Sequence, residues 1–186
     1  YLAQSYKDAK MFDKAITAYK KRIEMGGWYE EIYVSYYSIA VCLRHLDAPE
    51  SEIEAAFLTA YEKYPHRAEP LYSLAQYFRE KKQYEKAFKY GRKALSIPYP
   101  SKDILFVQKY VYDYALKDEV AVAAYYIGEH ELAVQLNSEI YPKVPDYMKD
   151  RVRSNAEFSI NALRKQLMDC IDTAMRSGMY DYKYRH

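Results

Sequence analysis

The sequence predicts an all-α protein, built as a helical solenoid of about four helix-turn-helix units with a C-terminal capping helix. A large apolar residue, an alanine and, three positions further on, an aromatic or aliphatic residue recur along the chain. Only 5 of 186 residues are glycine, which argues for few tight turns. The Gly- and Pro-containing segments fall between the repeats, where helices must break. These observations together favour stacked helices over any sheet.

The alanine of each first helix marks the repeat. Ala3, Ala40, Ala75 and Ala121 are separated by 37, 35 and 46 residues. Two spacings lie near the 34-residue period of tetratricopeptide (TPR) units, and the third implies an insertion of about a dozen residues between units three and four. A small residue lets the two helices of a unit approach closely, while bulky neighbours fill the groove against the next unit. The repeats predict a TPR-type solenoid, against the alternative of an unrelated helical bundle with accidental periodicity.

These units are expected to form one domain, residues 1–177. The expected ranges of the units are 1–27, 28–66, 67–100 and 110–145. Residues 146–177 predict a further amphipathic helix that caps the last unit, because a terminal repeat must shield the core from water. Its apolar face comprises Val152, Ala156, Ile160, Leu163, Leu167 and Ile171. Residues 178–186 form a polar and aromatic tail that we expect to be frayed, or ordered only by a partner.

Charge and cysteine content limit the classes of partner. The chain has 28 Lys and Arg against 26 Asp and Glu, and its basic runs, Lys20-Lys21-Arg22 and Arg151-Val152-Arg153, lie among acids as on a solvated helix face. No apolar run could span a bilayer, and no signal peptide is evident. Cys42 and Cys170 form no CxxC pair, which fits a reducing compartment. We therefore expect a soluble, intracellular (cytoplasmic) protein with no nucleic-acid or membrane partner. Because the sequence begins at Tyr1, already inside a helical pattern, we also expect it to be a piece of a longer chain.

No catalytic, metal or cofactor site is predicted for this chain. Cys42 and His45 share a helix face and could supply half a metal site, but ordinary packing is the stronger interpretation because zinc needs more ligands. The adjacent glycines precede Trp28 and not the Lys-Ser or Lys-Thr of a phosphate loop. Acid pairs such as Glu30-Glu31 and Asp118-Glu119 are typical of helical charge faces. We therefore expect a non-enzyme without cofactors.

The concave surface formed by the first helices is the candidate binding site. Helical spacing assigns to this groove Gln4, Lys7, Tyr37, Val41, Arg44, Tyr72, Gln76, Arg79, Asp118, Val122 and Tyr125. Aromatic and arginine side chains supply much of the binding energy at interfaces, and the alternative is a merely hydrated groove. The carboxylate grip of TPR co-chaperones, made by Lys, Asn and Arg, is not matched by this set. Replacing Tyr72 and Arg79 by Ala is expected to weaken ligand binding and leave helicity intact.

Several stretches resemble a narrower group than TPR proteins in general. YLAQSYKDA at residues 1–9, KRIEMGGW at 21–28, RAEPLYSLA at 67–75 and above all the segment 94–124 with its IPYP and VYDY motifs resemble the TPR region of TPR-containing family 2 glycosyltransferases. The resemblance runs from Tyr1 to about Phe158. In that family a preceding catalytic domain binds the nucleotide sugar with a metal-binding Asp-x-Asp motif, which this sequence lacks. The resemblance thus implies a non-catalytic part that helps to bind acceptor or to assemble subunits.

Three functions remain open from the sequence. The leading hypothesis is an interaction and acceptor-positioning module of a glycosyltransferase, whose catalytic domain would precede Tyr1. The second is a stand-alone TPR adaptor for a protein or peptide partner, and the third is a structural assembly protein. Because a solenoid has two ends with apolar surface, an end that is not capped could pair with the missing domain or form a homo-oligomer.

Overall fold

The computed structural model of the protein describes residues 2–183, with the side chains of residues 2–177, and its regular structure is helical throughout. Four helix pairs follow one another along the chain. They are α1 (Leu2–Asp8) with α2 (Phe12–Met25), α3 (Tyr29–His45) with α4 (Glu50–Lys63), α5 (Glu69–Glu80) with α6 (Tyr84–Leu95), and α7 (Leu116–Tyr126) with α8 (His130–Ile140). A long helix, α9 (Asp146–Lys183), follows them. The predicted solenoid of four units is therefore confirmed.

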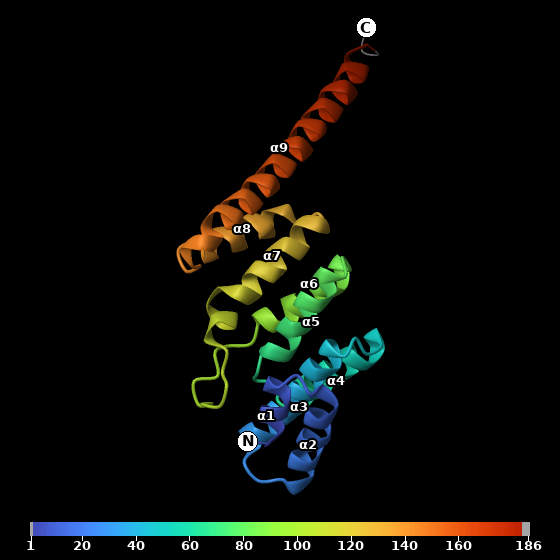
Figure 1. Cartoon of the computed structure of the whole chain (residues 1–186). Coiled ribbons are helices and arrows are strands. Elements are labelled where there is room, and N and C mark those ends of the chain that lie inside the picture. The colour runs from blue at the N-terminus through green and yellow to red at the C-terminus, as the bar shows by residue number, and fades with distance from the viewer. Residues whose placement is uncertain (1, 184–186) are drawn as a thin grey trace.

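The units stack into an elongated body, from α1 and α2 at one end to α8 and α9 at the other (Figure 1). Each helix packs against the next one in the chain, as expected where every repeat contacts only its neighbours. The repeat alanines Ala40, Ala75 and Ala121 are fully buried, and Ala3 is half-buried near the N-terminal end. The main core runs through the second, third and fourth units, with Phe57, Leu71, Phe78 and Val120 at its centre.

The turns inside the four units share one geometry. A residue seven positions after each repeat alanine has positive φ: these residues are Lys10, Asp47, Lys82 and Gly128. In the first turn the Lys10 N–H donates to Lys7 O at 2.9 Å and the Met11 N–H donates to Tyr6 O at 2.8 Å. Equivalent pairs of bonds close the other three turns. This is the Schellman motif, which satisfies the last carbonyls of the first helix and reverses the chain.

Close helix contact between the third and fourth units depends on Gly91 in α6. A Cβ atom built on Gly91 would lie 2.5 Å from Val120 Cγ2, a distance that real Cβ contacts do not show. The missing side chain therefore lets α7 of the fourth unit pack directly on α6. The sequence pattern assigned small residues to the contact within a unit, and Gly91 shows that a small residue also sets the spacing between two units.

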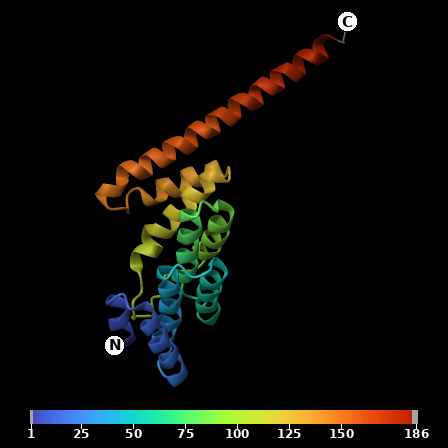
Figure 2. The same cartoon turned by 45° about the vertical axis from the view of Figure 1, so that its right-hand side comes forward.

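The insertion between the third and fourth units is a long connection, residues 96–110, which hangs back along the solenoid (Figure 1). It leads into η1 (Val111–Ala115), a π-helical turn continuous with α7. Figure 2 shows the same connection beside the blue N-terminal helices. Turns of this wide type occur often at functional sites. The insertion is thus a folded part of the structure next to the first units.

The last helix differs in extent from the prediction. It continues to Lys183, past Ser177, so residues 178–183 are helical and not part of a frayed tail, while 184–186 lie outside the described residues. Only its first turns cap the fourth unit, where Val152 packs with Ile140 and Val144. Every residue from Arg164 to Ser177 is exposed. The capping role therefore belongs to the proximal part, and the distal part projects from the body (Figures 1 and 2).

Candidate functional site

A buried ionic network fixes the insertion to the start of α5. Arg67 is 1% exposed and Glu69 is 0% exposed, and the Arg67 Nη2 donates to Glu69 Oε1 at 2.8 Å. Arg67 Nη1 also donates to Oδ2 of Asp103, in the insertion, at 3.2 Å. Burial by itself would lower the pKa of Arg67, but its hydrogen bonds to Glu69 raise the pKa, so the guanidinium stays charged. Tyr112, just after the insertion, donates to Glu69 Oε2 at 2.7 Å.

A second set of bonds joins the insertion to the start of α3. Glu30 is buried, and its Oε2 accepts the backbone N–H groups of Ile104 at 2.8 Å and Leu105 at 2.6 Å. The Tyr29 hydroxyl donates to Asp103 Oδ1 at 2.9 Å. A carboxylate that accepts backbone N–H bonds is among the stronger hydrogen-bonding arrangements. Hydrogen bonds to both the second and the third unit therefore hold the insertion in place.

These anchors hold residues 106–110 opposite α1 and α3 and so create a cleft of about 510 Å³. We call it the α1–α3 cleft. Its lining comprises Gln4, Lys7, Tyr33, Val34, Tyr37, Ser38, Arg67, Phe106, Val107, Gln108, Lys109 and Tyr110. Small-molecule and side-chain pockets in proteins are typically about 300–1,000 Å³. The cleft thus has the size and the mixture of aromatic and polar groups of a binding site.

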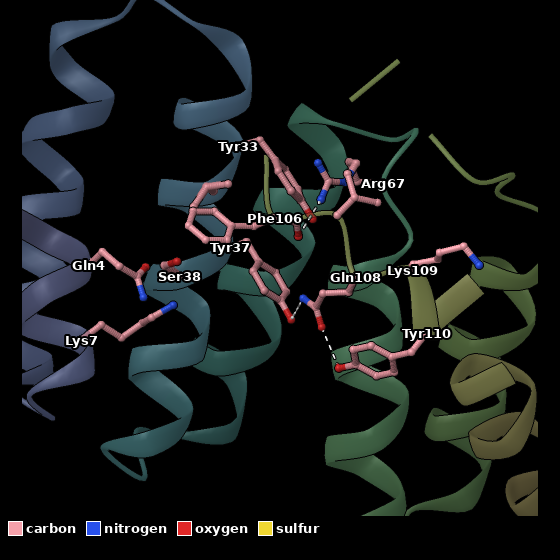
Figure 3. A pocket seen from close by; sticks show the side chains of 12 residues that line it. Gln4, Lys7, Tyr33, Tyr37, Ser38, Arg67, Phe106, Gln108, Lys109 and Tyr110 are labelled. Carbon is pink, nitrogen blue, oxygen red and sulfur yellow. Dashed lines mark hydrogen bonds between the residues drawn. The ribbon is translucent and has the colours of Figure 1, made fainter. Parts of the chain in front are cut away.

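A hydrogen-bonded chain of side chains crosses the floor of the cleft (Figure 3). The Tyr110 hydroxyl donates to Gln108 Oε1 at 2.8 Å, and Gln108 Nε2 donates to the Tyr37 hydroxyl at 3.2 Å. The Tyr37 hydroxyl also bonds with Ser73 Oγ of α5 at 2.9 Å. Burial raises the pKa of Tyr37 and of Tyr110, so both phenols remain neutral hydrogen-bonding groups. This floor is preorganised by its own bonds.

Two groups at the cleft remain available to a ligand. Lys7 extends its ammonium group toward the cavity in Figure 3, and no ion pair joins it to any residue that the structure describes. Phe106 is 62% exposed and has φ 50°, an unfavourable conformation for a bulky residue. Arg67 Nη2 contacts the Phe106 carbonyl oxygen at 3.4 Å. Backbone strain of this kind persists only where surrounding contacts impose it, and it is concentrated at functional sites.

The residues predicted for the groove fall into two groups. Gln4, Lys7 and Tyr37 line the α1–α3 cleft. Tyr72 is buried beneath Tyr110, with their rings edge to face at 6.3 Å. Tyr125 is half-buried and its ring lies 5.3 Å from that of His130. The structure brings the first three together and places Tyr125 at the other end of the solenoid.

The remaining charged and amide side chains predicted for the groove bind residues of a neighbouring unit or of α9; they are Arg44, Gln76, Arg79 and Asp118. Arg44 donates to Gln76 Oε1 at 3.0 Å and to Glu80 Oε2 at 2.6 Å. Arg79 makes a two-point ion pair with Glu119. On the concave face beyond the cleft, these side chains therefore connect successive units. Tyr72 and Arg79 support the stack, so a role for them in ligand binding stays a prediction.

These contacts between units also change the interpretation of the acid pairs. Asp118 accepts two hydrogen bonds from Arg151 of α9, at 3.1 and 2.8 Å. Burial raises the pKa of Glu119, and the facing Arg79 opposes this shift. The sequence pattern assigned both acid pairs to helical charge faces, but Glu30, Asp118 and Glu119 are buried, so that interpretation is wrong for these three residues. The sequence could not show this, because the residue type alone does not tell whether an acidic side chain is buried or exposed.

The structure gives the remaining sequence candidates ordinary roles. His45 stacks on Phe12 with ring centroids 4.8 Å apart, and Cys42 is buried in the core between the first two units. Within the described residues, no group of three or more His, Cys, Asp and Glu side chains is arranged to hold a metal ion. None of the helices described, α9 included, has the length and apolar character that crossing a bilayer requires.

Comparison with known proteins supports the fold. No family model matches the chain, and no curated protein matches its sequence. Among solved structures, the chain is similar to the crystal structure of MamA, with a TM-score of 0.58 and 14% sequence identity over 90% of this chain and 98% of that chain. At that identity the similarity bears on fold and not on function. The structure and this comparison together show a TPR-type helical solenoid.

Proposed function

We propose that the chain is a non-catalytic interaction module that binds an extended segment of a protein partner in the α1–α3 cleft. The observation that supports this function most directly is the position of Phe106, an exposed aromatic ring held in a strained conformation beside the cleft. Preorganised aromatic side chains lose little entropy on binding and are enriched among interface hot spots. The TPR-type fold supports the same proposal, because such solenoids present a concave surface to partners.

The charge of the cleft indicates which kind of peptide segment would bind there. Lys7 is a cation without an ion pair among the described residues, whereas Lys109, also at the cleft, pairs with Asp113 at 2.6 Å. A ligand carboxylate could therefore neutralise Lys7, while an apolar or aromatic side chain packs against Phe106 and Tyr37. The proposed ligand is an extended peptide with an aromatic or apolar anchor next to an acidic residue.

Selection from a random-peptide library displayed on phage tests this function. We expect peptides selected on the wild-type protein to be rich in aromatic and acidic residues. Their affinity should fall about tenfold or more with Phe106→Ser and with Lys7→Glu, since one hot-spot residue contributes about 2 kcal/mol. Phe158→Ser and Lys20→Glu are matched controls, because both residues are exposed and lie on other surfaces. Selected peptides that bind all four variants equally would contradict the proposal.

A glycosyl acceptor is the second candidate ligand. The insertion is the part of the sequence that most resembles family 2 glycosyltransferases, and residues 106–110 of it form one wall of the cleft. Tyrosine hydroxyls and the Gln108 amide on the floor are groups that suit a hydroxyl-rich ligand. This resemblance rests on sequence alone. A glycan array probed with the wild-type protein and with Phe106→Ser distinguishes the two candidates. Glycan binding by the wild type that is lost in the variant would favour the acceptor. No glycan binding by the wild type would favour the peptide.

A further inference from the structure

Two tyrosine rings are stacked on each other where the third unit meets the fourth. The ring centroids of Tyr84 in α6 and Tyr126 in α7 are 3.9 Å apart, and the ring planes differ by 10°. Aromatic pairs in proteins usually have centroids about 4.5–7 Å apart. Among the side chains that the structure describes, no other pair of tyrosine rings is as close or as parallel. The ring carbons of each residue therefore lie directly against the other ring.

The position of the two residues beside the turns of their units explains this contact. Tyr84 begins α6 two residues after the turn residue Lys82, and Tyr126 ends α7 two residues before Gly128. Both turns lie at the same edge of the solenoid (Figure 1). The missing side chain of Gly91 lets α6 and α7 approach closely. Helix packing thus brings together two phenols that belong to different units.

The stacked pair is open to an oxidant in solution. Tyr126 is 57% exposed, so an external one-electron oxidant can reach its ring and water can take up its proton. Tyr84 is half-buried beside it. Burial, followed by the hydrogen bond with Tyr126, raises the pKa of Tyr84, so its phenol keeps its proton until it is oxidised. The accessible ring is thus in contact with a second ring of the same chemistry.

We propose that Tyr84 and Tyr126 form a site of oxidative cross-linking, at which a haem peroxidase with hydrogen peroxide converts the pair into dityrosine. Each phenol loses one electron to the peroxidase and one proton to water. The two phenoxyl radicals then join through a bond between the ring carbons next to their hydroxyl groups. The coupled carbons lose their hydrogens as protons and the oxygens regain theirs, so one C–C bond replaces two C–H bonds. One hydrogen peroxide takes up the two electrons and two protons and leaves as two waters.

Proximity favours this pair over coupling between molecules. Groups that are held in contact react with effective concentrations far above those of free molecules in solution. The link would join α6 to α7 and close residues 84–126 into a loop that contains the whole insertion. A cross-link that closes a loop stabilises a protein mainly by restricting its unfolded chain. Oxidation would therefore fasten the third unit to the fourth.

Peptide mapping of the full chain after treatment with a haem peroxidase and hydrogen peroxide tests the site. Trypsin releases Tyr84 in residues 83–86 and Tyr126 in residues 118–143, which also contain Tyr125 and Tyr141. In the wild type we expect these two peptides to be joined, with a mass lower by two hydrogens than their sum. Tyr126→Phe should reduce the joined product about tenfold or more, although Tyr125 remains. Tyr125→Phe is the matched control and should leave the yield unchanged.

The phenylalanine variants keep an aromatic ring at the stack and lack only the hydroxyl group, and circular dichroism reports whether each one is folded. The joined product should have the mass of a single chain at every protein concentration. An equal yield in Tyr126→Phe and in the wild type would overturn the proposal. An unlinked wild type would also overturn it, under conditions in which the same peroxidase couples free tyrosine in a parallel sample.

Thermal unfolding of the oxidised proteins tests the closure of the loop. The oxidised wild type should melt about 5–15 °C above oxidised Tyr126→Phe, because only the wild type has a restricted unfolded chain. A thiol reductant in both samples prevents disulfides of Cys42 and Cys170, which are free cysteines, from contributing. Before oxidation the two proteins should melt within a few degrees of each other, about as expected for the loss of one hydroxyl group. Equal melting temperatures after oxidation would overturn the proposed fastening of the two units.

Discussion

The Tyr29 hydroxyl donates a hydrogen bond to the carboxylate of Asp103 at 2.9 Å, although 74 residues separate them in the chain. Asp103 is buried, and it also accepts a bond from Arg67 and lies 3.1 Å from His66 Nε2. Three side chains of the second and third units thus converge on one carboxylate of the insertion. Because the wall of the α1–α3 cleft follows three residues later, Asp103 controls the position of that wall.

Acidification should release the insertion. Burial alone would raise the pKa of Asp103, but hydrogen bonds from Tyr29 and Arg67 and the charge of His66 lower it below its ordinary value. An acid with a lowered folded-state pKa stabilises the fold above its unfolded pKa of about 4, and this stability is lost as the pH falls through the folded pKa. We expect hydrogen exchange of the Ile104 and Leu105 amides to lose protection below about pH 4, earlier than the core of α5.

The matched variant is Asp103→Asn, which keeps the size of the side chain and removes the charge. At neutral pH it should lower the free energy of unfolding by about 1–3 kcal/mol, since hydrogen bonds to a charged group are replaced by weaker ones. Protection of the two amides should then depend less on pH between 5 and 3 than in the wild type. An equally steep dependence in both proteins would mean that another acid controls the insertion.

The fold was predictable from the sequence because small residues and helix breaks recur at fixed positions. Ala40, Ala75 and Ala121 are buried as their spacing requires, and the turns at Asp47 and Gly128 close the helices where the breaks were expected. The length of α9 was not predictable in the same way. The stop signals were Gly178 and the polar residues after it, yet an isolated glycine only weakens a helix by about 1 kcal/mol and does not end it.

Replacing Gly91 by Ala should destabilise the stack through a steric conflict. A helix interior normally gains about 1 kcal/mol when Ala replaces Gly. Here the new Cβ would lie 2.5 Å from Val120 Cγ2, and overpacking of this kind costs about 1–3 kcal/mol. We expect a lower melting temperature and urea midpoint. Adding Val120→Ala should make the Gly91→Ala change less destabilising, and additive effects of the two substitutions would exclude this contact as the cause.

Replacing Gly128 by Ala should destabilise the protein for a different reason. No atom lies within 4 Å of a Cβ built on Gly128, but its φ is 87°, in the region that side chains disfavour. The loss should be about 1 kcal/mol, and it should be independent of substitutions in neighbouring units. The converse change, Lys82→Gly, removes the same strain at φ 59°. Equilibrium unfolding in urea measures both, and an unchanged midpoint for Gly128→Ala would show that the turn relaxes.

The candidate site was only partly predictable. Helical spacing identified Gln4, Lys7 and Tyr37, because residues on the same face of successive first helices must share one surface. It could not identify Phe106 or Gln108, since the insertion has no periodicity and its position depends on the buried acids that bind it. A useful signal was present in the sequence: the 46-residue spacing showed where extra chain enters the stack. Long connections in compact domains are often functional.

Replacing Arg79 by Ala should lower the free energy of unfolding, because the largely buried Glu119 loses its ion-pair partner. The Glu119 side chain is 8% exposed and that of Arg79 is 30% exposed, so Arg79→Ala leaves an almost buried carboxylate without its partner. Breaking a fully buried pair costs about 3–5 kcal/mol, and the partial exposure of Arg79 reduces our expectation to about 1–3 kcal/mol. Equilibrium unfolding at pH 7 measures this loss. It should be smaller in the double variant Arg79→Ala with Glu119→Gln, where no unpaired charge remains.

The pH dependence of Arg79→Ala gives an independent check of the same relationship. Burial already raises the pKa of Glu119 above its ordinary value, and loss of the opposing Arg79 should raise it further. A group with a raised folded-state pKa contributes stability that is fully present below its unfolded pKa and is lost as the pH rises through the folded value. The destabilisation by Arg79→Ala should therefore be smaller at pH 5 than at pH 7. In the double variant with Glu119→Gln this difference should disappear, and its persistence there would assign the effect to another acid.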